Sequence, residues 1–586
     1  MSRIYVYTAI AIILGTHFLY YPKWQKNNTE ATISWDVSGY YLYLPAIFIY
    51  NDLKKCEFLD DVLEKYNPTP EVQQGYRHAT SGNFVIKYSI GQALVYSPYF
   101  FIGHVWAKLS TEYPADGFSL PYQISISMGA LLISVIGLLI LYSVLKIYFS
   151  KKISGLAVLV LVIGSNYLNY AAIDGAMTHN TLFTLYAALI LLTVRFYENP
   201  TSLRGMGIGV LVALCTLVRP TDLISLAIPL LWGIDIFKNG APGRRLSFFK
   251  KNYKSILPAM IICILIGSIQ FIYWYYVTGE WVVYSYQDQG FSWLNPHIKN
   301  GLISYKSGWL TYSPFMIFSI LGFYFLYIKH KQLFVATLFF VASYIYISFA
   351  WDIWWYGGSL GQRTMVQSYP ILAFPLAAFL NQFFHWNRSI QLIVGTVAAI
   401  FIYMNLWFTH QAHLGGMLHV GQMTKAYYWA TLLTYNKEKE HLKLLDGVDK
   451  VYMGERKRIR TIYQDTSFHV ELDQEVQYSE EKMMSLNVDP NKDWMRVSAE
   501  FTIGPKERNF WYMTQFRIRI YNHDEVINEY MIRPQRHMND HQTKRLFIDV
   551  PVPQTPWNKL SVKFTNAEGD KWIKIEHLKI EAFDVP

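Results

Sequence analysis

The residue whose type and surroundings best suit acid–base chemistry is Asp36, in the segment SWDVSGYYLYLPAIFIY. Its neighbours in the sequence include the aromatic residues Trp35, Tyr40 and Tyr41. A carboxylate among aromatic rings is partly removed from water, which raises its pKa toward the range where it can accept a proton from a hydroxyl. The competing interpretation is an ordinary aspartate that caps or begins an amphipathic helix. The segment therefore indicates either a general base or a helix start.

A second polar pair, Asp174 and His179, lies in NYAAIDGAMTHNTLF, between two apolar runs. A carboxylate and an imidazole at this spacing can bind a metal, a phosphate or a sugar hydroxyl. The alternative is an aspartate at a helix start and a histidine that is satisfied in the core. Loops are where binding residues concentrate, so both interpretations stay open.

An arginine, Arg219, interrupts the apolar stretch CTLVRPTDLI just before Pro220. It could form a local ion pair with Asp222 at a helix end. Its permanently charged fork is equally suited to a lipid-linked phosphate.

Two long segments combine aromatic rings with charges and glycines: YSYQDQGFSWLNPHIKNGLISYKSGWLTYSP and WDIWWYGGSLGQRTMVQSYP. Tryptophan and tyrosine alone could form a belt at the membrane interface. A belt does not require interleaved glycines, carboxylates and cations, whereas a sugar-phosphate site needs stacking faces, polar clamps and positive charge. We therefore favour a ligand site, whose candidate residues are Asp288, His297, Lys306, Asp352, Tyr356 and Arg363.

Other chemistries find no support in the sequence. It contains no Walker loop, no dinucleotide-binding glycine signature, no HExxH and no GxSxG. The three cysteines predict neither a disulfide framework nor a thiolate metal site. We expect no cofactor and no metal. The net charge of +10 lies largely in short loops between apolar runs, so we read it as a sign of membrane topology and expect no nucleic-acid partner.

The elements that must position these residues are membrane helices. Hydrophobic residues make up 52% of the chain and charged residues only 16%, against about 25% charged in soluble domains. Apolar runs of near-membrane length recur up to about Trp407. They predict about eleven transmembrane helices, near residues 4–22, 121–147, 154–171, 178–196, 205–218, 222–237, 254–277, 313–329, 332–350, 367–384 and 388–408.

Basic loops then give these helices an orientation. If the segment 89–109 is interfacial or re-entrant, loops such as 238–254 fall on one side, which is the cytoplasmic side by the positive-inside rule. Asp36, Asp174 and Arg363 then share the outer face.

The chain changes character near residue 450. From there apolar and polar residues alternate in short stretches such as RVSAEFTI and FRIRIY, which predicts an all-β sandwich or jelly roll. We predict a catalytic membrane domain over 1–410, an amphipathic linker over 411–450 and an extracytoplasmic β domain over 451–586. The β domain's tryptophans, at 494, 511, 557 and 572, either stack on glycan or fill its core.

Three segments carry a family resemblance: KYSIGQALVYSPYFFIGH, GFSWLNPHIKNGLISYKSGWL and WWYGGSLGQRTMVQSYPILAFPLA. Over about residues 1–410 the chain resembles the GT-C glycosyltransferases, and is similar to the dolichyl-phosphate-mannose protein mannosyltransferases and the lipid A aminoarabinose transferases. The resemblance places Asp36 at the family's first-loop catalytic aspartate and Asp174 at an acidic residue of the next outer loop. Asp36 lacks the adjacent second acid of the mannosyltransferase Asp-Glu pair, and the family's Pro-Pro motif is not intact.

The resemblance implies transfer of a sugar from a polyprenyl-phosphate carrier to a glycan, lipid or protein acceptor, at the outer face of the inner (cytoplasmic) membrane. Asp36 would be the base of an inverting reaction. Arg363 and Lys306, with Arg219 and Lys87, would hold the phosphate. The main alternative is a transporter or flippase for a lipid-linked glycan, which predicts polar residues along the middle of several helices. A binding or scaffold protein would leave Asp36 and Arg363 unexplained.

Overall fold

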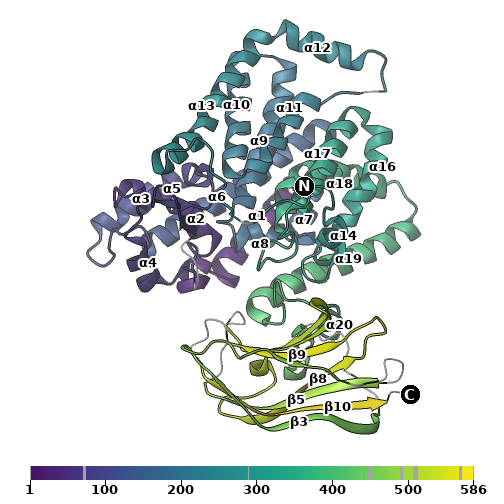
Figure 1. Cartoon of the computed structure of the whole chain (residues 1–586). Helices are drawn as coiled ribbons and strands as arrows, with labels where there is room; N and C mark the ends of the chain where they lie inside the picture. The colour runs from purple at the N-terminus through teal and green to yellow at the C-terminus, as the bar shows by residue number, and fades with distance from the viewer. Residues whose placement is uncertain are drawn as a thin grey trace. The chain divides into compact units, whose positions relative to one another are not determined.

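The chain forms two compact units, Met1–Gly421 and Gln422–Pro586. The computed structural model describes residues 2–584 apart from 70–73, 236, 288, 437, 447–451, 453–454, 487, 489–492, 506–511 and 567–570. The first unit is helical and the second consists mainly of β-strands (Figure 1).

The helical unit carries long apolar helices joined by short helices and turns. Its α-helices are α1 (Ser2–Gly15), α2 (Asp36–Tyr41), α3 (Tyr43–Phe48), α4 (Leu59–Tyr66), α5 (Gly91–Leu109), α6 (Leu120–Tyr148), α7 (Lys151–Gly164), α8 (Tyr167–Ala172), α9 (Thr178–Glu198), α10 (Ser202–Val218), α11 (Ala227–Leu231), α12 (Ala241–Lys251), α13 (Tyr253–Thr278), α14 (Ile298–Ile303), α15 (Trp309–Tyr312), α16 (Ile317–Lys329), α17 (Lys331–Ala350), α18 (Tyr369–Phe383) and α19 (Arg388–His410). Tighter or wider turns are η1 (Thr16–Tyr20), η2 (Lys23–Gln25), η3 (Asn28–Glu30), η4 (Pro220–Leu226), η5 (Pro314–Met316), η6 (Arg363–Ser368) and η7 (Gln411–Gly415), and β1 (Gly75–Arg77) pairs antiparallel with β2 (Phe84–Ile86).

The predicted multi-pass helical membrane class is confirmed. Each predicted membrane segment contains a helix, but the count of eleven spans is not confirmed. Within the described residues, six helices have the length and apolar composition to cross a membrane: Arg3–Gln25, Leu120–Tyr148, Thr178–Glu198, Tyr253–Thr278, Lys331–Ala350 and Arg388–Gly415. Three further apolar helices are shorter: Ser202–Val218, Pro220–Leu231 and Pro314–Lys329.

The prediction was wrong in detail for the segment 222–237. Instead of one continuous helix, it contains part of the 3-10 turn η4 and the five-residue α11. Pro220 opens η4 and Pro229 lies inside α11. Proline has no N–H to donate, so Pro229 removes one hydrogen bond that a continuous helix would contain, which favours the short elements of this segment. The break leaves Arg219 in extended backbone at the end of α10.

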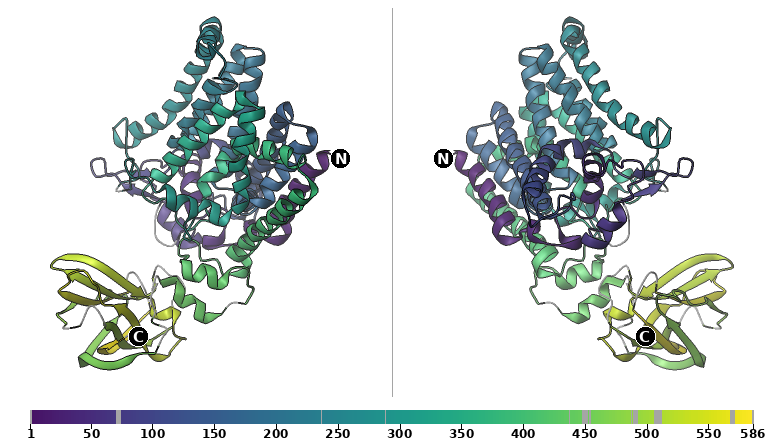
Figure 2. Two further views of the ribbon diagram at one scale, coloured as in Figure 1. Left: turned by 90° about the vertical axis from the view of Figure 1, so that its right-hand side faces the viewer. Right: turned by 90° about the vertical axis from the view of Figure 1, so that its left-hand side faces the viewer.

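Close helix packing depends on small residues. Helices α10 and α13 lie side by side, as do α16 and α18 (Figures 1 and 2). Gly322 of α16 faces α18 so closely that an added Cβ would fall on the Pro375 carbonyl oxygen. A Cβ added to Gly267 of α13 would meet no other atom within 4 Å.

The second unit is a two-sheet β domain, as predicted. Its strands are β3 (Lys457–Leu472), β4 (Lys482–Met484), β5 (Asp493–Ile503), β6 (Gln515–Asn522), β7 (Glu525–Ile532), β8 (Thr543–Pro551), β9 (Lys559–Thr565) and β10 (Ile573–Asp584), with α20 (Lys425–Thr431), η8 (Lys439–Asp446) and η9 (Pro534–Arg536) beside them. One antiparallel sheet has the order β3-β10-β5-β8 and the other β4-β9-β6-β7. Inward residues of both sheets, such as Val497 and Ile518, form one buried core, which identifies the domain as a sandwich.

The glycine contact between α16 and α18 leads to a stability prediction. We expect Gly322→Ala to lower the free energy of unfolding by about 1–3 kcal/mol, the usual cost of overpacking. Gly267→Ala is the matched control. It should leave the unfolding temperature unchanged or raise it, since alanine favours a helix. Thermal unfolding in detergent measures both. A Gly322→Ala protein as stable as the control contradicts the described packing.

Candidate active site

Asp36 is the first residue of α2, and its carboxylate is held by two long-range partners. Tyr88 Oη donates a hydrogen bond of 2.8 Å to one carboxylate oxygen, and Arg363 Nη2 donates one of 2.7 Å to the other. Trp35, with a φ of 49°, occupies the capping position, and no side chain caps this helix. The side chain of Asp36 is therefore engaged in tertiary contacts instead of capping.

The electrostatics of Asp36 differ from the sequence prediction. Burial acts to raise its pKa, but the Arg363 charge, the Tyr88 hydrogen bond and the Lys87 charge outweigh burial, so the pKa lies below its usual value. The expected shift toward neutrality was wrong in direction, because the sequence does not reveal the arginine that packs against this carboxylate. Asp36 is ionised at neutral pH.

Arg363 begins the turn η6, and the glycine-rich loop before it brings the side chain to Asp36. Gly357 and Gly361 in that loop adopt positive φ, a conformation that suits glycine. The Arg363 side chain is 18% exposed and that of Asp36 23%, so a ligand can reach both. The Nε atom of Arg363 is buried and has no hydrogen-bond partner among the described residues. The hydrogen-bonding capacity of the Arg363 guanidinium is therefore not fully used by the described residues.

Arg219 supplies a second guanidinium. Its Nη1 lies 3.3 Å and 3.4 Å from the two ring nitrogens of His179, and the guanidinium lies 5.5 Å from the centre of the Tyr356 ring. The predicted local ion pair with Asp222 is absent among the described residues. Asp222 accepts hydrogen bonds from Gln367 and Tyr186 instead.

A buried hydrogen-bond chain supports Arg219 from behind. His179 Nδ1 lies 2.6 Å from Gln367 Oε1, and Gln367 Nε2 donates to both oxygens of Asp222 at 3.0 Å. All three side chains are buried. Sequence reasoning missed the role of Gln367, because an uncharged amide in an apolar run gives no signal until its partners are known. The chain fixes His179, which in turn positions Arg219.

Tyrosines join the two arginines into one site. Burial raises the pKa of Tyr286 and of Tyr356 to about 12, and in both cases the charges of Arg219 and Arg363 act in the opposite direction. Both guanidinium groups therefore lie near the same two phenols. We call the set Asp36, Lys87, Arg219 and Arg363, with Tyr40, Tyr88, Tyr286 and Tyr356, the arginine–aspartate site.

Lys87 belongs to this site, whereas Lys306 has a different neighbour. The Lys87 ammonium lies 5.3 Å from the centre of the Tyr286 ring and acts on the charge of Asp36. The Lys306 ammonium lies 3.4 Å from the centre of the Trp355 ring, and burial lowers its pKa. No described contact joins Lys306 to Asp36.

Asp174 and His179 do not share a partner among the described contacts. Asp174 pairs with Lys23 at 2.5 Å and accepts a hydrogen bond from Asn169, which also contacts His413. Burial would raise the pKa of Asp174, but the Lys23 charge, then that of His413, and hydrogen bonds from Lys23 and Asn169 lower it from 3.8 to about 2. Asp174 thus ties η2 to the α8–α9 connection.

The remaining aromatic-loop candidates have structural roles. Asp352 accepts hydrogen bonds from the Ser292 hydroxyl and the Gly290 backbone, which fastens the two aromatic loops together. The His297 ring lies 6.5 Å from that of Trp354. Asp288 lies outside the described residues.

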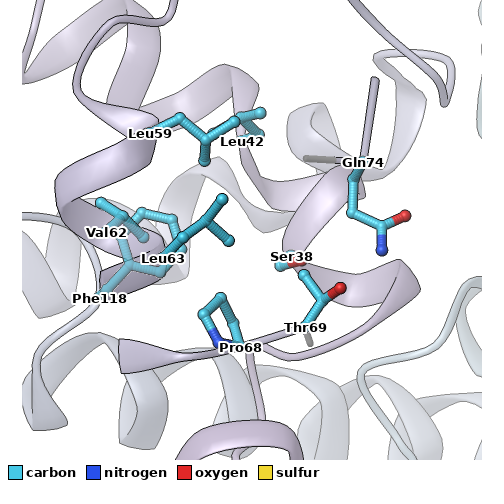
Figure 3. Close-up of a pocket in the computed structure, with 9 residues that line it drawn as sticks. All are labelled: Ser38, Leu42, Leu59, Val62, Leu63, Pro68, Thr69, Gln74 and Phe118. Carbon is cyan, nitrogen blue, oxygen red and sulfur yellow. The ribbon is translucent and has the colours of Figure 1, made fainter. Parts of the chain in front are cut away.

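A small cavity close to α2 is a packing gap and not a substrate site. Its wall is mostly apolar, from side chains such as Leu42, Leu63 and Phe118, with Ser38 and Thr69 on one side (Figure 3). Its volume is about 10 Å³, room for about one water molecule.

The Asp174–Lys23 pair leads to a pH-dependent stability prediction. Because the folded-state pKa of about 2 lies below the unfolded value of about 3.9, the ionised carboxylate stabilises the fold above pH 3.9 and loses this effect as pH falls toward 2. We expect Asp174→Asn to unfold at a lower temperature than wild type at pH 7 and the gap to narrow at pH 3. Thermal melts at both pH values test this. A gap that widens in acid contradicts the assigned ion pair.

Individual known proteins resemble the chain only distantly. No curated protein matches the chain in sequence. Among solved structures, an oligosaccharyltransferase from Archaeoglobus fulgidus has 10% identity and a TM-score of 0.41, covering 73% of this chain and 57% of its own. Arabinosyltransferase EmbB from Mycobacterium smegmatis has 9% identity and a TM-score of 0.35, covering 98% and 64%. The chain thus spans less than two thirds of either structure's length, and neither likeness enters the argument.

A family model gives the informative match. Residues 121–277 match the model described as dolichyl-phosphate-mannose-protein mannosyltransferase. This segment runs from α6 to α13 and contains Asp174, His179 and Arg219, while Asp36 and Arg363 lie outside it. This segment is similar to the dolichyl-phosphate-mannose-protein mannosyltransferases, and the predicted resemblance to membrane glycosyltransferases is confirmed.

Proposed function

We propose that the chain is a membrane glycosyltransferase that moves a sugar from a polyprenyl-phosphate carrier to a hydroxyl of a glycan, lipid or protein acceptor. One observation carries the proposal: an ionised aspartate, Asp36, sits against Arg363 in a partly exposed site that also holds Arg219 and Lys87. A lipid-linked sugar phosphate needs positive charge for its phosphodiester, and an acceptor hydroxyl needs a base.

The cations of the arginine–aspartate site suit a phosphate that gains charge as it leaves. Arg219, Arg363 and Lys87 outnumber the single carboxylate of Asp36, so the site carries excess positive charge before a donor binds. The carrier phosphate has one negative charge in the donor and gains another when the sugar bond breaks. Fixed guanidinium groups stabilise that developing charge without rearrangement. Tyr40, Tyr286 and Tyr356 offer ring faces and hydroxyls to the sugar.

The ion pair between Asp36 and Arg363 couples donor binding to base strength. Without donor, Arg363 holds Asp36 ionised but makes it a weak base. When the donor phosphate takes over the Arg363 fork, the carboxylate loses its strongest counter-charge and its proton affinity rises. Asp36 then accepts the acceptor's proton as the hydroxyl attacks. A single displacement with one carboxylate inverts the anomeric centre, unlike a two-carboxylate retaining mechanism.

The remaining roles follow from charge and position. Asp174, in the next outer loop, and His179, at the start of α9, support the site, and Lys306 adds a positive charge on Trp355. Basic loops assign these residues to the outer face of the inner membrane, with the β domain on the same side. Residues 1–410 form the catalytic domain, 411–450 the linker and 451–586 the outer domain. The chemistry assigned to Asp36 and the cations needs no cofactor.

Removing the carboxylate charge tests the base. Asp36→Asn keeps the side chain's size and can still contact Tyr88 and Arg363, so the fold should persist. We expect transfer from a polyprenyl-phosphate sugar to fall about 10²–10⁴-fold, as for loss of a general base. Asp61→Asn, an exposed aspartate of α4 in the same outer loop, is the matched control and should transfer at the wild-type rate. Near-wild-type transfer by Asp36→Asn rules out Asp36 as the base.

The pH dependence of transfer tests the coupling. Arg363 is the strongest influence that lowers the pKa of Asp36, so Arg363→Gln should raise it. We expect the acidic limb of the kcat/KM profile to move to higher pH in Arg363→Gln, with a higher KM for the donor. An acidic limb that stays at the wild-type pH, or moves down, contradicts the described pairing.

A further inference from the structure

A hollow of the β domain lies on the outer face of the sheet β3-β10-β5-β8. Side chains from all four strands line it, and its volume is about 440 Å³, within the range of small-ligand sites. We call it the sheet groove. None of the described tryptophans of this domain, 494, 557 and 572, lines it, so it is distinct from any tryptophan platform.

The wall of the groove contains buried and partly buried polar groups. Ser498 of β5 lines it and is buried, and Asp549 of β8, which is also buried, lies behind the lining residue Arg496. Arg496 binds both oxygens of Asp549, at 2.7 Å and 2.8 Å, and its guanidinium lies 3.6 Å from the centre of the Phe547 ring. Phe547 keeps 40% of its surface exposed. The result is a fixed, charged and aromatic wall.

Some donors of the groove remain available. Arg545 is exposed and makes only long contacts, 3.4 Å to the Ser498 hydroxyl and 3.4 Å to the His577 carbonyl. It has no carboxylate partner among the described residues. Arg456 Nη1 is buried without a hydrogen-bond partner and lies 3.6 Å from Glu581. Both arginines can donate to an incoming acceptor.

A bulge in the central strand β10 shapes this face. The pairing of β10 with β5 shifts between Glu576 and Lys579, and its pairing with β3 shifts between Glu576 and Leu578. His577, at the bulge, has a φ of 54°, the left-handed region that favours glycine. Bulges and such strained residues concentrate at functional sites. Here the bulge turns His577 and the following Lys579 to the groove.

The charges of the groove narrow the ligand class. Four arginine or lysine side chains and two carboxylates line it, and Asp549 behind the wall neutralises Arg496, which leaves an excess of one positive charge. The phosphates of a nucleic acid only accept hydrogen bonds, so they offer no donor to the two carboxylates of the groove. Saccharide hydroxyls both donate and accept, so they suit carboxylates next to guanidinium groups, and the exposed ring fits the C–H face of a pyranose. An acidic sugar adds a carboxylate that an arginine fork can bind with two hydrogen bonds.

We propose that the sheet groove binds an acidic oligosaccharide, with Arg545 on a sugar carboxylate and Phe547 against a sugar ring. Binding needs no donor and does not depend on the transfer reaction. The β domain then has a ligand-binding function that is separate from sugar transfer.

Titration calorimetry on the full chain in detergent tests this, with a galacturonic acid tetramer against a neutral galactose tetramer. We expect saturable binding of the acidic tetramer only, weakened about tenfold or more by Arg545→Ala and by Phe547→Ala. Both side chains are exposed, so both variants should keep the wild-type melting temperature. Lys563→Ala, a cation on β9 of the other sheet, is the control and should bind like wild type.

Several results would overturn the proposal. These are no saturable binding by the wild type, equal affinity in Arg545→Ala and Phe547→Ala, equal binding of the neutral tetramer, or equally tight binding of a single-stranded DNA of the same charge. The Asp36→Asn protein should bind the acidic tetramer like wild type. Loss of transfer in that variant with retained binding separates the groove from the catalytic proposal.

Discussion

The helical unit depends on one constraint: a carboxylate that is withdrawn from water must keep a counter-charge. Asp36 meets this requirement with Arg363, a partner 327 residues away in the chain, at 2.7 Å. This contact joins the start of α2 to the loop between α17 and α18, and the tyrosines and the second arginine are arranged around it. A buried unpaired charge costs several kcal/mol, so the pairing restricts which loop conformations are compatible with the fold.

Two other carboxylates meet the constraint to different degrees. Asp174 has a counter-charge in Lys23, whereas Asp222 has no directly bonded cation among the described residues and accepts hydrogen bonds from Gln367 and Tyr186. Both carboxylates accept hydrogen bonds from neighbouring side chains, which stabilise the fold. Arg219 differs, because its closest described neighbours are a histidine and a tyrosine ring and none is a carboxylate. It is the cation of the site best prepared for an external anion.

Much of the architecture could be predicted from the sequence, because hydrophobic run length and alternation report directly on membrane helices and sandwich strands. The β segments RVSAEFTI and FRIRIY do form paired strands, β5 and β6. The site was only partly predictable. Asp36 and Arg363 stand out in the sequence as charges in aromatic surroundings. The sequence does not show that they are in contact, and this contact determines the direction in which the pKa of Asp36 shifts. Gln367 and the sheet groove gave no sequence signal, since an amide in an apolar run and arginines on alternating strands look like ordinary surface or core.

The distance in sequence between Asp36 and Arg363 has a consequence for biosynthesis. At a synthesis rate of about 5–20 residues per second, the ribosome needs roughly 15–65 s to extend the chain from one partner to the other. During that time Arg363 is not yet present to pair with the carboxylate. Asp36 can form this ion pair only near the end of synthesis of the helical unit, which makes closure of its loop a late step that truncated chains cannot complete.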